Sequence, residues 1–170
     1  MGVTYQRPED DRYNYPEAYL RARIVGVLGG RTAEEIVYGT RTTGAENDIE
    51  QATDLATRMV TRWGMSEKLG TVKLAPRENA FLGGGYPSEK PYSEETARAV
   101  DEEVLRIINE SHEEARRLLT KHRKELDALA QALLEHETLD EEEILEVTGL
   151  SPAPPLENRK APIPDADSRA

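Results

Sequence analysis

Residues 47–63 decide the fold of this chain, and they read NDIEQATDLATRMVTRW. Apolar residues recur every third or fourth position, the spacing that places side chains on one face of an α-helix. Gly64 follows immediately, and glycine readily ends a helix in the left-handed conformation. We therefore predict a one-sided helix over 47–63, with an apolar stripe of Ile49, Ala52, Leu55, Ala56, Met59, Val60 and Trp63.

Two glycines interrupt the helix expected before this one. Pro16 suits a first helical turn, and we expect the helix to run from there to about Tyr38. Gly29 and Gly30 lie in its interior, at a cost of roughly 1 kcal/mol per glycine relative to alanine. Bare backbone here would let another segment approach closely, and we favour this packing role over a functional one.

Three more helices are expected in the second half of the chain. Ser93 can cap a long helix, and a further helix covers about 123–135. Thr138-Leu139-Asp140-Glu141 has the pattern of a capping box, which would open a last short helix that stops at Gly149. Residues 65–92 are rich in glycine and proline and hold brief apolar pieces at 71–74 and 80–82 that could be short strands, so they favour a small β or loop element. The fold class is therefore mainly α, a helical bundle-like domain with this element between its second and third helices.

The charge of the chain is concentrated in one segment. The 170 residues carry 33 acids and 22 bases, a net charge of -11. Residues 93–147 hold 17 of the acids and only 7 of the bases, which fits the solvated face of the later helices. Such a face repels phosphate backbones, so we expect no nucleic-acid partner. We expect one domain over 1–150, followed by a disordered tail over 151–170, which contains five prolines.

Several kinds of catalytic site are excluded by composition and motif. The absence of cysteine excludes disulfides, thiolate metal sites and cysteine nucleophiles. The chain has no P-loop, no apolar run long enough to span a bilayer and no signal peptide. The segment from His112 to Arg116 fails as a zinc motif, because arginine stands where a second histidine must be. We expect His112 to be a helix-surface residue, and no complete catalytic set is present.

One carboxylate lies out of place on the predicted helix. At 100° per residue, Asp48 points with the apolar stripe rather than away from it. An aspartate in the first turn is favoured by the helix dipole, and its side chain could simply cap free backbone amides. The alternative is an inward-facing ligand for a metal or another cation. The residues alone leave both possibilities open.

Two stretches resemble the peptidase domain of FtsH-type ATP-dependent zinc metalloproteases. Residues 29–39 read GGRTAEEIVYG and residues 42–48 read TTGAEND. Further matching segments are Gln51–Ala56, Met59–Ser66, Tyr92–Ala97 and Glu137–Leu139. The likeness runs in order over roughly residues 2–150.

This resemblance implies a function and a cofactor. Proteins of the family carry an N-terminal membrane anchor, an AAA+ ATPase module that uses ATP, and this helical peptidase domain. They form hexameric rings that unfold and degrade membrane and soluble proteins, with the peptidase domain on the cytoplasmic side or its organellar equivalent. Their zinc is held by the two histidines of His-Glu-x-x-His and by a downstream aspartate, whose position matches Asp48.

The resemblance also implies what this chain should lack. In the family, the His-Glu-x-x-His helix precedes the strand that Gly2-Val3-Thr4 resembles. We therefore expect a truncated chain without two zinc ligands, the general-base glutamate, the ATPase module and the membrane anchor. Alone, it should be soluble and inactive and should not retain zinc. Exposure of the apolar side around Leu55 and Met59 would make it self-associate or become partly molten.

A second interpretation belongs to a different functional class. The chain would then be a non-catalytic helical relative that joins the protease ring as an assembly or adaptor module.

Overall fold

The computed structural model describes residues 14–74 and 92–152. Within them the chain is helical and contains no strand, which confirms the mainly α class. The expected strand at 2–4, the apolar piece at 80–82 and most of the proline-rich tail lie outside the described residues. The elements are α1 (Glu17–Val27), α2 (Gly29–Tyr38), a 3-10 turn η1 (Thr43–Ala45), α3 (Glu46–Thr61), α4 (Glu94–Lys121), α5 (Arg123–His136) and α6 (Glu141–Thr148).

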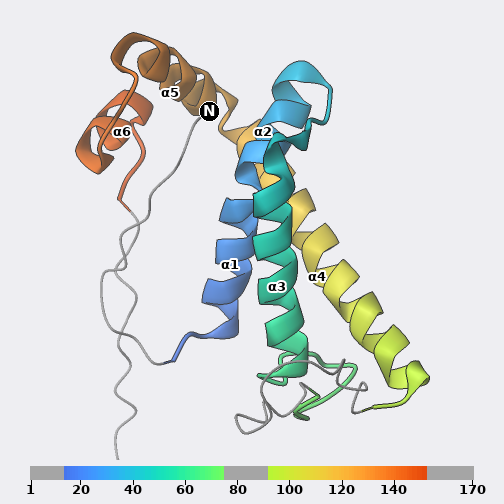
Figure 1. Ribbon diagram of the computed structural model, residues 1–170. Helices are drawn as coiled ribbons and strands as arrows, with labels where there is room; N and C mark the ends of the chain where they lie inside the picture. Colours follow the sequence, from blue (N-terminus) through green and yellow to red (C-terminus); the bar gives the residue numbers. More distant parts are fainter. Residues whose placement is uncertain (1–13, 75–91, 153–170) are drawn as a thin grey trace, which may run out of the picture. The chain divides into compact units, whose positions relative to one another are not determined.

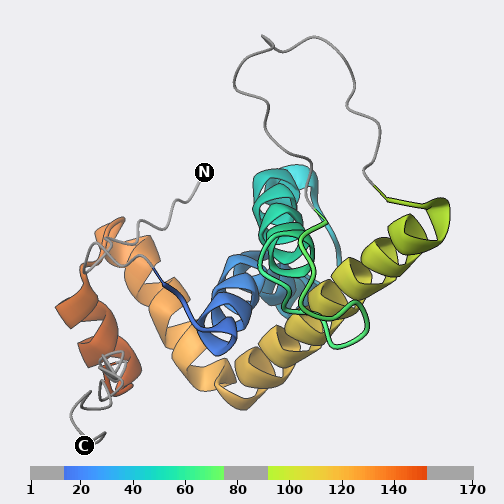
Figure 2. The same ribbon diagram turned by 90° about the horizontal axis from the view of Figure 1, so that it is seen from below.

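The chain divides into two compact units, and the first runs to His122. In it, α1, α3 and α4 pack against one another, and α2 packs on α4 (Figure 1). Figure 2 shows the same helices from below, with the loop that follows α3 lying against α4. Three of the largest fully buried side chains, Ile24, Met59 and Ile107, come one each from α1, α3 and α4. The core of this unit is therefore the seam between those three helices.

The predicted apolar stripe of α3 is buried in the middle of the helix and exposed at its two ends. Ala52, Ala56, Met59 and Val60 are buried, and the two alanines let the neighbouring helices approach closely. The exposed members lie at the two ends of the predicted segment: Ile49, in the first turn, is 40% exposed, and Trp63, just beyond the end of α3 at Thr61, is 47% exposed.

The expected exposure of α3 around Met59 is wrong. Met59 is completely buried and Leu55 packs partly buried against the core, because α1 and α4 both contact α3. The apolar side of α3 around Leu55 and Met59 therefore gives no reason to expect a self-associating or partly molten chain.

The single helix expected up to Tyr38 is two helices with a kink between them. Leu28 interrupts the helical geometry with ψ near -7°, directly before the glycine pair. Backbone hydrogen bonds still cross the break, from Leu28 N–H to the Ile24 carbonyl and from Thr32 N–H to the Leu28 carbonyl. The buried Thr32 hydroxyl also donates to the Leu28 carbonyl, at 2.8 Å, so its polar atom is satisfied. Paired glycines are a known cause of such kinks.

The predicted ends of α4 and α6 are largely confirmed. The Ser93 hydroxyl accepts a hydrogen bond from Thr96 N–H, which makes Ser93 the N-cap of the 28-residue helix α4. Gly149 ends α6 with φ of +65°. The capping box of α6 lies two residues later than expected, because Asp140 is the extended residue that accepts from Glu143 N–H while Glu143 accepts from Asp140 N–H. Helices α5 and α6 pack on each other in the second unit.

The described part of the segment after α3, residues 64–74, is a loop fixed at both ends. Gly64 has φ of +63°, which reverses the chain so that Met65 N–H donates to the Met59 carbonyl. At the other end, Leu74 N–H donates to the Thr61 carbonyl at 2.7 Å. The apolar piece at 71–74 forms no strand.

Replacing Gly64 by alanine should cost more stability than the same change at Gly70. Both glycines have positive φ, so alanine would be strained at either by about 1–2 kcal/mol. At Gly64 the new Cβ would also lie 3.0 Å from the Thr71 Cα, whereas nothing lies within 4 Å at Gly70. Thermal unfolding of the two variants measures the difference. Equal melting temperatures would show that the close contact between Gly64 and Thr71 does not add to the cost of the alanine.

Candidate functional site

Asp48 lies in the first turn of α3, half-buried. The N-cap of α3 is Ala45, and no side chain caps this helix end. Within the part of the chain that the structure describes, the Asp48 carboxylate makes no hydrogen bond and no ion pair. The capping alternative is therefore not what the structure shows, and no described residue occupies the carboxylate oxygens.

The glycine pair of α2 provides the close approach that the sequence suggests, at Gly30. A Cβ built on Gly30 would lie 3.9 Å from Oδ2 of Asp48, whereas one on Gly29 would meet nothing within 4 Å. The Asp48 carboxylate therefore lies beside bare backbone of α2.

The segment leading into α3 is fastened to α2 by a polar contact. The Thr42 hydroxyl donates to Oε2 of Glu34 at 2.9 Å and accepts from Gly44 N–H at 3.2 Å. Its first bond ties the loop to α2, and its second caps η1, which leads directly into α3. The segment that precedes the first turn of α3 is thus connected to α2.

Glu35 is the centre of a second polar cluster, which sequence reasoning missed. Its carboxylate is only 11% exposed and lies 3.3 Å from Arg31 Nε, 3.0 Å from Arg41 Nε and 3.3 Å from Arg116 Nη2. His112 Nε2 lies 3.3 Å from Oε2 of Glu35, and the side chain is 20% exposed. The expectation that His112 is a helix-surface residue is therefore wrong, since it faces α2. The spacing of Arg31 and Glu35 was a visible signal, but the contacts from α4 were not.

Among residues 14–74 and 92–152, no three histidine, aspartate or glutamate side chains are grouped so that they could hold a metal ion. Asp48 can supply one oxygen ligand of a type that zinc accepts. A zinc site in a protein needs three or four protein ligands, so Asp48 alone is not enough. A zinc ion at this position would need donors from elsewhere.

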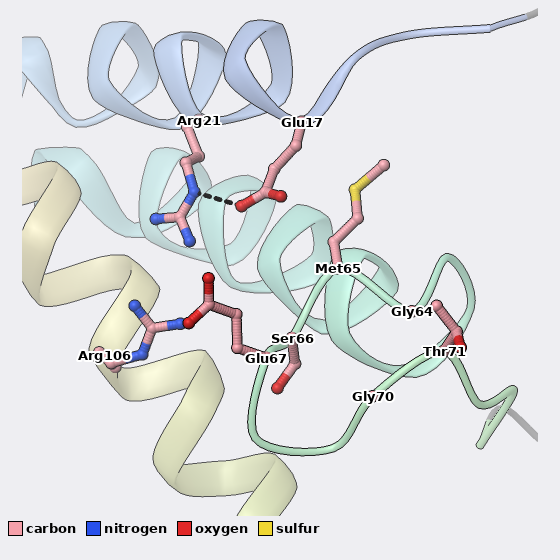
Figure 3. Close-up of a pocket in the computed structure, with 9 residues that line it drawn as sticks. All are labelled: Glu17, Arg21, Gly64, Met65, Ser66, Glu67, Gly70, Thr71 and Arg106. Atoms are coloured by element: carbon pink, nitrogen blue, oxygen red, sulfur yellow. Dashed lines mark hydrogen bonds and ion pairs between the residues drawn. The ribbon is translucent and has the colours of Figure 1, made fainter.

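A surface pocket of about 480 Å³ opens between α1, α4 and the loop after α3 (Figure 3). The Glu67 carboxylate points toward the space between the guanidinium groups of Arg21 and Arg106. These arginines are already paired, Arg21 with Glu17 and Glu110, and Arg106 with Glu103 and Glu110. The pocket therefore offers few free charges for catalysis. It is lined by Glu17, Arg21, Gly64, Met65, Ser66, Glu67, Gly70, Thr71 and Arg106.

Glu103 fastens this loop to α4. Its buried carboxylate accepts from the Ser66 hydroxyl at 2.7 Å and from two nitrogens of Arg106 at 3.0 Å. The hydrogen bonds from Arg106 hold the pKa of Glu103 below its ordinary value of 4.5, although burial acts in the opposite direction and Ser66 supports the lowering. Arg106 also lowers the pKa of Glu110. Contrary to the prediction from the sequence, the acidic residues of 93–147 therefore do not all lie on a solvated face, because Glu103 is buried.

Lowered pKa values make the first unit sensitive to acid. A carboxyl group whose pKa is lower in the folded state stabilises the fold above its unfolded value, and this stabilisation is lost as the pH falls through the folded value. We expect the free energy of unfolding to fall as the pH drops below about 4.5. Glu103→Gln should flatten this dependence and cost roughly 1–3 kcal/mol at pH 7.

Urea unfolding of this variant across pH measures both effects. The matched control is Glu114→Gln, which removes an exposed partner of Arg117 on the same helix and should change stability far less. If the two variants unfold alike at pH 7, Glu103 does not hold the loop.

No described helix is long and apolar enough to cross a membrane.

A family model and several known proteins similar to this chain all belong to one family of proteases. Residues 1–147 match peptidase family M41. The chain is 69% identical, over 99% of its length, to an "ATP-dependent zinc metalloprotease FtsH" of Syntrophus aciditrophicus, covering 23% of that protein. It is 54% identical, over 91% of its length, to a protein of the same name in Thermobaculum terrenum, covering 24% of it. An "ATP-dependent zinc metalloprotease FtsH 4" of Sphaerobacter thermophilus is 46% identical over 99% of the chain, which covers 25% of that protein. The chain thus spans about a quarter of the length of these relatives.

Proposed function

Because this chain belongs to peptidase family M41, we propose that it is part of an ATP-dependent zinc metalloendopeptidase and supplies one zinc ligand, Asp48. Protein substrates, a hexameric ring and a membrane anchor elsewhere in the parent protein belong to the same proposal. The observation that carries it is the availability of the Asp48 carboxylate, which lies beside Gly30 and makes no bond within the described residues.

The surrounding residues suit a fixed ligand position. Burial of Ala52 and Ala56 anchors α3 just beyond the turn that carries Asp48. The Thr42–Glu34 hydrogen bond fixes the segment that enters α3. At Gly30, the missing side chain leaves the carboxylate unobstructed on the α2 side. When bound, zinc would polarise the scissile carbonyl and activate a water molecule, and Asp48 would supply one of its oxygen ligands.

Measuring the zinc that the chain retains on its own tests whether it carries only one ligand of the zinc site. Its 170 residues contain no His-Glu-x-x-His and no P-loop. Because a single carboxylate cannot replace a ligand set that includes two imidazoles, we expect well under one zinc per chain and no cleavage of casein. Elemental analysis after dialysis and a casein assay measure both. About one zinc per chain with chelator-sensitive cleavage would overturn this expectation.

A chimera tests the role of Asp48 directly. The chain would replace the corresponding quarter of the Syntrophus aciditrophicus relative, to which it is 69% identical. Loss of an outer-shell partner costs about 10–100-fold in metal affinity or activity, so loss of a ligand in Asp48→Asn should cost no less than about 100-fold. Zinc content and ATP-dependent casein degradation are the measurements.

The matched control for this chimera is Asp54→Asn. Asp54 lies on the same helix and is exposed, so its substitution should leave both zinc content and activity unchanged. Retention of zinc by Asp48→Asn, or an equal loss in both variants, would contradict a ligand role for Asp48.

A further inference from the structure

Positive charge exceeds negative charge around Glu35, in contrast to other arginine clusters on this unit. Arg106 contacts two carboxylates, and Arg117 uses two nitrogens on both oxygens of Glu114. At Glu35, three arginines share one carboxylate, and each reaches it within 3.3 Å through a single nitrogen. The three arginines and Glu35 together carry a net charge of about +2.

Two of these guanidinium groups have donors to spare. Arg41 is 66% exposed and contacts Glu35 through Nε, while Arg116 is 46% exposed and contacts it through Nη2. No other hydrogen bond or ion pair is seen for either within the described ranges. The neighbouring acid Glu34 accepts a hydrogen bond from Thr42 and makes no ion pair with either arginine within the described ranges.

The three arginines meet at Glu35 because two helices and a loop converge there. Arg31 comes from α2, Arg41 from the segment before η1, and Arg116 from α4, and their common contact is Glu35. A guanidinium group offers five N–H donors in a planar fork that matches a carboxylate in two-point contact. The half-buried position of Glu35 and Arg31 weakens the screening by solvent.

We propose that Arg31, Arg41 and Arg116 form a binding site for the carboxylates of an acidic polypeptide segment. A net charge of +2 is neutralised by two carboxylates, which neighbouring acidic side chains of one segment deliver together. A free dianion such as phosphate would concentrate its charge beside Glu35, which disfavours it. This site does not depend on Asp48 or on zinc, so it goes beyond the proposed protease function.

Nuclear magnetic resonance titration of the whole chain with a hexaglutamate peptide tests the proposal. We expect amide shifts at residues 39–45 and 112–116, saturable binding, and weakening as salt is raised. Arg41→Gln and Arg116→Gln should each weaken binding roughly three- to tenfold. Arg41 lies in an exposed loop, and the amide spectrum of each variant confirms that the fold is retained.

Three controls make the outcome decisive. A hexaglutamine peptide should cause no shifts, and Arg117→Gln should bind as the unaltered chain does, because Glu114 already occupies Arg117. Inorganic phosphate is the third probe. The proposal is overturned if hexaglutamate shifts no residues here, if phosphate binds here and hexaglutamate does not, or if Arg117→Gln weakens binding as much as Arg41→Gln.

Discussion

The burial of the apolar face of α3 between α1 and α4 is the constraint on which the first unit depends. Met59 and Val60 fill the seam, and Ala52 and Ala56 allow the two partners to approach. Full burial of a side chain such as Met59 contributes about 1.5–3 kcal/mol, which is large beside the net stability of a small domain. The same packing fixes the direction of α3 and therefore the place of Asp48 at its first turn.

Polar contacts then fix the segments that enter and leave this seam. Thr42 and Glu34 hold the entry to α3, while Ser66 and Glu103 hold the loop that leaves it. Helix α4 carries partners along its length, since Glu103 contacts the loop near one end and Arg116 contacts Glu35 near the other. One long helix thus organises both polar clusters, although its sequence reads as an acidic surface helix.

Local signals in the sequence predict the helices well but not their pairing. The Ser93 cap, the terminal Gly149 and the stripe of α3 are readable because each depends on neighbours within a few residues. The choice of α1 and α4 as the partners of α3, and the contact of His112 with Glu35, depend on which helices pack together, which periodicity does not encode. For the candidate site, the wheel places Asp48 on the apolar side. In the Glu35 cluster, the four-residue spacing of Arg31 and Glu35 is a local signal, but His112 and Arg116 come from α4, and no local pattern reveals them.

Hydrogen exchange of the 170-residue chain tests the central claim that the α3 seam holds the first unit together. Amides of residues 52–60 should exchange at least about a thousandfold more slowly than unprotected amides, because exposing them requires nearly global unfolding. Those of α6, none of whose residues is buried, should exchange faster. Exchange of residues 52–60 as fast as that of α6 would contradict the account.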